Sequence, residues 1–331
     1  MGPEIRCRPF DESCGCGPGY VSHVFAPVAS ATSAAEGLAD AVADAHVGWL
    51  LAAVLLHVGG QLSRGFAWGA VLEAAWRDAS PRRACAWHVC GAGLTGVLSP
   101  RGGDVVRIGL AKRELREASW PALGGTLAAE GSFELASSVI LVAAALAVGV
   151  GGFHVPAPGL LGIAVAAAAA VLLLGRRSTR VRRVVSEIGR GLTVLREPRR
   201  FLGRVLPWQV AGRLLRLASL GCFLHAFGLP AGPAVIVATS VTQGSGRMLP
   251  IPGAGTAAAA AALLAVLPVA AGRDVDASAV GALAIAQPAL LTLVGLTISV
   301  ALLVVLLGAR TPRALMRAAR TLAAQPAAAK P

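Results

Sequence analysis

Charged residues are scarce in this sequence of 331 residues. Asp, Glu, Lys and Arg together make up 14% of it, whereas soluble globular domains carry about 25%. Hydrophobic residues make up 55%, and the mean hydropathy is +0.68. This composition excludes an ordinary soluble protein and indicates a chain that lies largely within a membrane.

The long apolar runs also lack any alternation of polar and apolar residues. They are rich in Ala and Leu, which excludes a transmembrane β-barrel, because barrel strands alternate lipid-facing and lumen-facing residues. Runs of about 20 apolar residues span about 30 Å of hydrocarbon as helices. The sequence therefore predicts an all-α, polytopic integral membrane bundle.

Catalytic and metal-binding motifs are missing as well. There is no His-Glu-x-x-His motif, nucleophile elbow, Walker loop or Asp-rich motif of lipid-phosphate transferases. Two cysteine groups, one before residue 17 and one formed by Cys85, His88 and Cys90, lack the paired spacing of zinc sites. We expect no enzymatic activity, no metal, no cofactor and no ATP-driven transport.

Basic residues outnumber acidic ones by 30 to 17. In a soluble protein this excess suggests nucleic acid, but here the arginines flank the apolar runs, as topology signals do. We therefore expect no nucleic-acid partner. The partner that the charge implies is anionic lipid at the membrane surface.

The apolar runs divide the chain into three parts. We expect residues 1–45 to be a disordered or over-extended N-terminus without a signal peptide, residues 46–308 to form the transmembrane domain, and residues 309–331 to be a basic cytoplasmic tail. The predicted spans are 46–70, 122–150, 159–174, 205–227 and 278–307. The last of these is either one helix or two pieces broken near Pro288.

Two short hydrophobic arms remain, 84–118 and 233–271, and each is broken by a Pro/Gly turn. Segment 176–200, with nine Arg and two Glu, belongs on the cytoplasmic side. Counting spans from there makes the first arm enter and leave on the inner side and the second on the outer side. The sequence thus predicts two oppositely oriented re-entrant hairpins, an inverted repeat typical of transporters. The alternative is two ordinary helix–loop–helix connections.

Broken backbone at membrane depth is tolerated where it lines a watery cavity. Its free N–H groups then favour an anion. The residues predicted to make the two re-entrant turns are Pro100, Gly102, Gly103, Pro250, Pro252, Gly253 and Gly255.

Three arginines, Arg101, Arg107 and Arg247, lie in or beside these turns, and we expect them to bind the phosphate of a lipid headgroup through forked hydrogen bonds. Glu130 and Glu134, one turn apart on an apolar helix, are expected to face the interior and to pair with Arg107 or Arg247. Glu130 could instead snorkel at the inner interface.

Other arginines are expected at membrane surfaces. Arg64, close to Trp68, reads as an interfacial pair. Arg213 and Arg216 lie near the inner end of their helix and are expected to snorkel.

The turn segments resemble a known family. Gly93 to Arg107, with the run Pro-Arg-Gly-Gly-Asp-Val-Val-Arg, resembles the first signature of the lysylphosphatidylglycerol synthase transmembrane, or flippase-like, family. Glu130 and Glu134 look like its acidic pair, and Leu249 to Gly255 is similar to its second signature. The likeness covers about residues 46–308. One departure is that alanines follow Thr256, where the family usually has an acidic residue.

The resemblance implies a flippase-like transmembrane domain without the aminoacyltransferase domain of full-length synthases. It implies translocation, or assistance to translocation, of an anionic or polyprenyl-linked lipid in the cytoplasmic membrane, with Asp104, Glu130 and Glu134 balancing the charge of the arginines. The alternative is a non-transporting membrane partner of a separate glycosyltransferase or lipid synthase.

Overall fold

The computed structural model describes residues 40, 42–98, 102–147, 179–246 and 254–307, and every regular element in this part of the chain is a helix. The elements in chain order are α2 (Val47–Ala75), α3 (Pro81–Leu98), α4 (Gly102–Glu114), α5 (Trp120–Ala147), α7 (Thr179–Gly191), α8 (Thr193–Arg196), α9 (Pro198–Arg200), the π-helical turn η1 (Phe201–Val205), α10 (Leu206–Ala226), α11 (Pro233–Gly246), α12 (Ala254–Ala271) and α13 (Ala277–Leu307). The expected N-terminal segment as far as residue 39, the span 159–174 and the tail from 308 lie outside the described residues.

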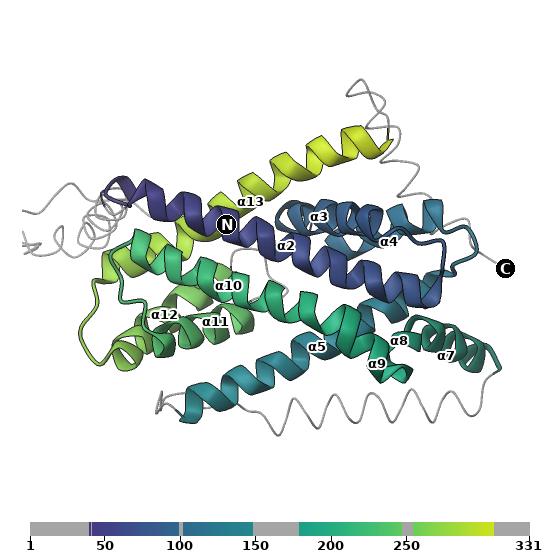
Figure 1. Cartoon of the computed structure of the whole chain (residues 1–331). Coiled ribbons are helices and arrows are strands. Elements are labelled where there is room, and N and C mark those ends of the chain that lie inside the picture. Colours follow the sequence, from purple (N-terminus) through teal and green to yellow (C-terminus); the bar gives the residue numbers. More distant parts are fainter. Residues whose placement is uncertain (1–39, 41, 99–101, 148–178, 247–253, 308–331) are drawn as a thin grey trace, which may run out of the picture.

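Long helices run along the molecule (Figure 1). Two of them, Val47–Ala75 and Ala277–Leu306, are long and apolar enough to cross a membrane, within the part of the chain that was described. The segment 278–307, for which the sequence leaves one helix or two open, is a single helix with Pro288 inside it. At about 1.5 Å per residue, the 31 residues of α13 extend over about 46 Å, longer than the hydrocarbon core.

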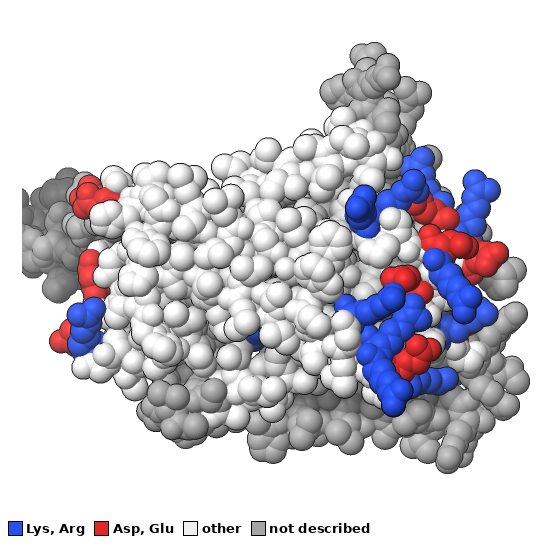
Figure 2. All heavy atoms as spheres, viewed as in Figure 1, with Lys and Arg blue, Asp and Glu red and all other residues white. Residues whose placement is uncertain are grey.

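Charged side chains gather at the two ends of the face shown in Figure 2, and the surface between them is almost entirely uncharged. The larger group lies at the end formed by α4, α7 and α9 (Figures 1 and 2). Exposed basic residues of α4 and α9 include Arg113 and Arg199. An uncharged belt between two charged ends is the pattern expected of a bundle that lies across a membrane.

The two short arms form two helical hairpins. Helix α3 packs against α4, and α11 packs against α12. The first hairpin lies in the half of the molecule that holds α7 to α9, and the second lies in the opposite half (Figure 1). Short connections join α2 to α3 and α10 to α11, so each hairpin starts at an end of the bundle. The intervening turns, 99–101 and 247–253, lie outside the described residues.

Glycines allow the helices to approach closely around the first hairpin. A Cβ at Gly91 would crowd the carbonyl oxygen of Gly103 on α4, and a Cβ at Gly93 would overlap the carbonyl oxygen of Gly295 on α13. Small residues at helix crossings replace the hydrophobic driving force that helices lack inside lipid. They fix α3 between α4 and α13.

Helix α13 begins at a capped N-terminus. Asp276 accepts hydrogen bonds from the backbone N–H of Ser278 (2.9 Å) and from its hydroxyl (2.7 Å). These two bonds, that of the hydroxyl above all, lower the pKa of the Asp276 carboxyl, because they favour its ionised form. The cap satisfies one of the N–H groups that every helix start leaves open.

Candidate functional site

Glu130 of α5 lies at the centre of a set of buried ion pairs. Its side chain is 3% exposed. Oε2 accepts a hydrogen bond from Arg107 of α4 at 2.8 Å, and Oε1 accepts one from Arg64 of α2 at 3.0 Å. A buried carboxylate needs such partners, because an unpaired charge in an apolar interior is costly. Two helices thus supply the cations that hold Glu130 inside the bundle.

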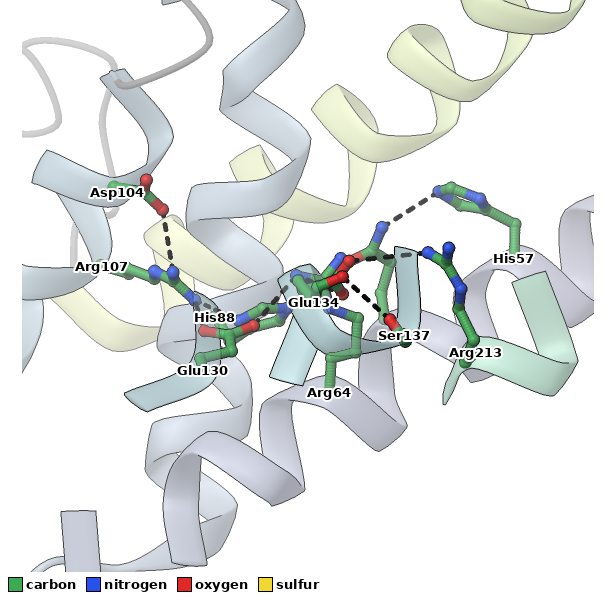
Figure 3. Close-up of polar contacts among 10 residues, drawn as sticks. His57, Arg64, His88, Asp104, Arg107, Glu130, Glu134, Ser137 and Arg213 are labelled. Carbon is green, nitrogen blue, oxygen red and sulfur yellow. Dashed lines mark hydrogen bonds and ion pairs between the residues drawn. The ribbon is translucent and has the colours of Figure 1, made fainter. Parts of the chain in front are cut away.

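Glu134 extends the set by one helical turn. It faces the same side of α5 as Glu130 because residues four apart share a face. Arg64 lies 3.3 Å from its Oε1, and Arg213 of α10 lies 3.6 Å from its Oε2 (Figure 3). Arg64 therefore bridges the two glutamates, and α10 is joined to α5 through Arg213.

Arg107 has two further polar contacts. It forms an ion pair with Asp104 at 2.9 Å, and its Nη1 lies 2.7 Å from Nδ1 of His88. A guanidinium is only a donor, so Nδ1 of His88 must be the acceptor and the ring is neutral with its hydrogen on Nε2. Within the described part of the chain, this buried Nε2 has no hydrogen-bond partner.

Arg107 also contacts the ring of Trp68. The guanidinium lies 5.2 Å from the centre of the Trp68 ring, within the range of a cation–π contact. The indole N–H donates to Thr126 on α5 at 3.0 Å, and the ring packs edge-on against Trp87. Since the Trp68 side chain is fully buried, these contacts fix the position of its ring and of the guanidinium of Arg107 that packs on it.

The six ionised side chains form what we call the ion-pair network. Its members are Arg64, Asp104, Arg107, Glu130, Glu134 and Arg213. Three arginines face three carboxylates, so the formal charges cancel. Such a balance makes a group of charges tolerable inside a membrane bundle.

A cavity of about 530 Å³ borders the network. Five helices supply its walls, and its polar lining includes His57, Gln61, Arg64, Arg107, Arg216 and Thr292. Figure 3 shows His57 and Arg64 of α2 together with Asp104 and Arg107 of α4. The volume is that of a site for a small molecule.

The N-terminal end of α4 forms part of the cavity wall, because Asp104 in its first turn lines the cavity. A helix N-terminus carries partial positive charge. Together with the arginines of α2, α4 and α10, it makes the wall suitable for an anionic group.

Several residues predicted from the sequence meet at this site. Asp104 and Arg107 line the cavity, and Glu130 and Glu134 lie in the network beside it. Arg107 is one of the two partners proposed for Glu130 from the sequence.

The predicted turn residues are only partly described. Gly102 and Gly103 are the first residues of α4, and Gly255 is the second residue of α12 rather than part of a loop. The other predicted residues lie outside the described residues, namely Pro100, Arg101, Arg247, Pro250, Pro252 and Gly253.

Two of the three arginine positions expected at membrane surfaces, those of Arg64 and Arg213, are wrong. Arg64 faces the glutamates of α5 instead of an interface, and its neighbour Trp68 is fully buried. Arg213 is paired with Glu134, and Arg216 lines the cavity. Each of these long side chains reaches a carboxylate of α5 or the cavity, which position along the helix does not reveal.

The interior position of the polar residues of α2 was missed, although the sequence carries a signal for it. His57, Gln61, Arg64 and Trp68 are spaced by four, three and four residues, so they form one stripe on an otherwise apolar helix. The stripe faces the cavity and the network. A polar stripe of this kind on a spanning helix indicates an interior face.

Comparison with known proteins gives one match. The family model described as lysylphosphatidylglycerol synthase TM region matches residues 21–287. The match begins before α2 and ends within α13. No significant match was found among curated proteins or among solved structures.

Proposed function

This chain belongs to the lysylphosphatidylglycerol synthase transmembrane family, and on that premise we propose that it is a flippase-like protein. It moves, or helps to move, an anionic or polyprenyl-linked lipid headgroup between the leaflets of a cytoplasmic membrane, which it crosses several times. Its role is transport and not catalysis. The observation that carries the proposal is the cavity between five helices, lined by arginines and bordered by buried ion pairs.

The two hairpins are re-entrant in this proposal. The arms of the first, α3 and α4, have 18 and 13 residues, about 27 and 20 Å as helices. Those of the second, α11 and α12, have 14 and 18. The 13 and 14 residues of α4 and α11 fall short of the roughly 17–25 residues of a full crossing, and the 18 residues of α3 and of α12 stand at its lower limit. The positions of the two hairpins in opposite halves of the molecule support an inverted repeat (Figure 1).

An anionic headgroup would compete with the carboxylates for the arginines. In the structure, Glu130 accepts one hydrogen bond from Arg64 and one from Arg107. A phosphate entering the cavity accepts hydrogen bonds from the same forked guanidinium groups. We infer that Glu130 and Glu134 balance the charge of the arginines and hold them in position until the lipid arrives. Arg101 and Arg247 are the further contacts that the sequence suggests.

Membrane orientation follows from the charged end of the bundle. The end formed by α4, α7 and α9 carries most of the exposed basic residues (Figure 2), so it faces the cytoplasm in this proposal. The cavity then receives lipid from the inner leaflet through the first hairpin.

Reconstitution in liposomes tests the proposal. The wild-type protein should expose a fluorescent anionic lipid to an impermeant reductant faster than protein-free vesicles do. Arg64→Gln and Arg107→Gln should each slow the exchange at least about tenfold, the cost of one charge-assisted hydrogen bond. Arg83→Gln is the matched control, because Arg83 pairs with Glu114 and its side chain is 63% exposed.

Two results would go against transport. One is a wild-type rate equal to that of protein-free vesicles for every anionic and polyprenyl-linked lipid tried. The other is that Arg64→Gln and Arg107→Gln exchange lipid as fast as Arg83→Gln does. If in addition the protein co-purifies with a glycosyltransferase or lipid synthase, the non-transporting role is favoured.

A further inference from the structure

Helix α13 is packed very differently on the two sides of Pro288. Before the proline, Val280 and Leu283 are fully buried, and they belong to an apolar core cluster shared with α10, α11 and α12. From residue 288 to residue 306, Ser299 is the only buried residue. The first part of α13 is therefore anchored in the second half of the molecule, whereas the second part lies on the surface of the bundle.

The second part of α13 forms a wall of the cavity that is one helix thick. Leu291 and Thr292 line the cavity, while the next residue, Leu293, is 63% exposed. Helix α13 lies along the edge of the uncharged belt (Figures 1 and 2), where an apolar surface faces lipid tails. Among the described residues, a single helix thus separates this side of the cavity from the hydrocarbon of the membrane.

The contact between α3 and α13, which we call the α3/α13 seam, consists largely of small residues. Gly96 faces Thr292 across it, and the hydroxyl of Ser299 donates to the carbonyl oxygen of Val89 at 3.2 Å. Helix α13 holds no charged side chain, so no ion pair strengthens the seam. Inside lipid, the hydrophobic effect does not hold helices together. Opening the seam therefore requires only the loss of packing contacts and a few hydrogen bonds.

The other walls of the cavity are joined by charged side chains. Arg64 of α2 and Arg107 of α4 both bond to Glu130 of α5. His88 of α3 contacts Arg107, and Arg213 connects α10 to α5. Helix α13 takes no part in these contacts because it carries no charge. Of the five helices around the cavity, α13 is therefore the one that can move without breaking the ion-pair network.

Pro288 lies at the boundary between the two parts of α13 and lines the cavity. Proline has no N–H, so the carbonyl oxygen of Ala284, four residues earlier, lacks its usual helical donor. Sharp bends of helices occur mainly at prolines and at a few other features. A bend at Pro288 would move the second part of α13 away from α3 while the first part stays in the core.

We propose that residues 288–307 of α13 form a lateral gate, which bends away from α3 at Pro288 and opens the cavity to the hydrocarbon of the membrane. The inference rests on the proposed function and specifies how a lipid reaches the cavity. The headgroup passes through the α3/α13 seam while the tails remain among the surrounding lipids. A lipid that enters in this way never has to leave the membrane.

Two native thiols on α3 report on the gate without any ligand. Cys90 is fully buried, and its thiol donates to the carbonyl oxygen of Ser299 on α13 at 3.8 Å. Cys85 is 4% exposed, and its thiol donates to the carbonyl oxygen of Leu62 on α2 at 3.5 Å. Cys85 is therefore the matched control. Alkylation of both thiols by N-ethylmaleimide is followed by mass spectrometry, with the full-length protein in vesicles of phosphatidylcholine.

The rate at which a buried thiol reacts follows the population of the open state. Cys90 should therefore react at least about tenfold faster than Cys85. Pro288→Ala restores the missing N–H donor and should slow the reaction of Cys90 at least about threefold, with that of Cys85 unchanged. Equal rates for the two thiols, or a Cys90 rate that Pro288→Ala leaves unchanged, would overturn the gate.

A disulfide across the seam tests the gate during lipid exchange. In Gly96→Cys with Thr292→Cys, the two Cβ atoms lie 3.2 Å apart, close to the roughly 3.5–4.5 Å of disulfides. Gly60→Cys with Leu215→Cys joins α2 to α10 over 3.7 Å. It is the matched control, because Gly60 lines the cavity as Thr292 does. Each double variant is compared in its oxidised and reduced forms.

Oxidation should slow lipid exchange at least about tenfold across the α3/α13 seam, with recovery on reduction, and should change the rate of the control less than about twofold. If oxidation slows neither variant, or both equally, the gate is overturned and the proposed function stands. If the wild type moves no lipid, the proposed function fails. The ratio of the Cys90 and Cys85 rates then still decides whether the seam opens.

Discussion

Arg107 on α4 and Glu130 on α5 form a buried ion pair with 2.8 Å between Nη1 and Oε2. The pair joins the first hairpin to the long helix that follows it, and both side chains are less than 10% exposed. The energy of such a pair depends on both members being present, because either charge left alone would lack water as well as a partner. Mutations that remove one charge are therefore the most informative.

Glu130→Gln should destabilise the protein by about 3–5 kcal/mol, the range for breaking a buried ion pair. The reason is that Arg64 and Arg107 lose their shared carboxylate. Denaturant unfolding of the detergent-solubilised protein measures the change. Glu114→Gln, which breaks the exposed pair with Arg83, is the control and should cost less than about 1 kcal/mol. Similar losses for the two variants would contradict the central position of Glu130.

His88→Leu should destabilise the protein by about 1–3 kcal/mol. The substitution removes Nδ1, which accepts a hydrogen bond from Arg107. His88→Gln should lose less, since an amide oxygen can accept the same bond. The difference between the two variants, measured by thermal unfolding in one detergent, is the decisive quantity. If His88→Gln lowers the stability as much as His88→Leu does, the hydrogen bond with Arg107 is not what His88 contributes to stability.

Gly93→Ala should destabilise the protein by about 1–3 kcal/mol through overpacking. The added Cβ would overlap the carbonyl oxygen of Gly295 at the crossing of α3 and α13. Gly48→Ala is the matched control, because a Cβ there meets nothing within 4 Å and Ala favours helix. Unfolding midpoints of the two variants compare these effects. A Gly93→Ala midpoint equal to that of the wild type would show that the helices separate easily.

The cap of α13 should make stability depend on pH. The folded pKa of Asp276 is lowered by the bonds from Ser278, so the stabilisation is complete above the unfolded pKa, about 4 for Asp. It is lost as the pH falls through the folded value. The stability difference between wild type and Asp276→Asn should thus be largest near pH 7 and shrink in acid. A stability difference that does not change with pH would show that the ionised carboxylate of Asp276 does not stabilise the helix start.

The helices could largely be predicted from the sequence, because an apolar run inside a membrane can satisfy its backbone hydrogen bonds in few ways other than a helix. The expected spans 46–70 and 205–227 differ from α2 and α10 by a few residues at their ends, and the expected arm 84–118 corresponds to α3 and α4. Pro288 left open whether 278–307 is one helix or two, since proline breaks helices in water more readily than in a packed bundle. The structure has one helix there.

The site was harder to predict than the fold. Glu130 and Glu134 stood out because carboxylates are rare on an apolar helix. Arg64 and Arg213 did not, because a long basic side chain near a helix end can reach the membrane surface as easily as the interior. Whether these side chains turn to the surface or to the interior depends on the positions of α2 and α10 beside α5, which the sequence does not show.

The balance of charge in the ion-pair network has an electrical consequence. A unit charge that crosses a potential of 100 mV does work of about 2.3 kcal/mol. Because the three arginines and three carboxylates of the network cancel, a rearrangement that shifts them together moves no net charge. If the chain transports an anionic lipid as proposed, the voltage across the membrane acts on the lipid and not on the ion-pair network itself.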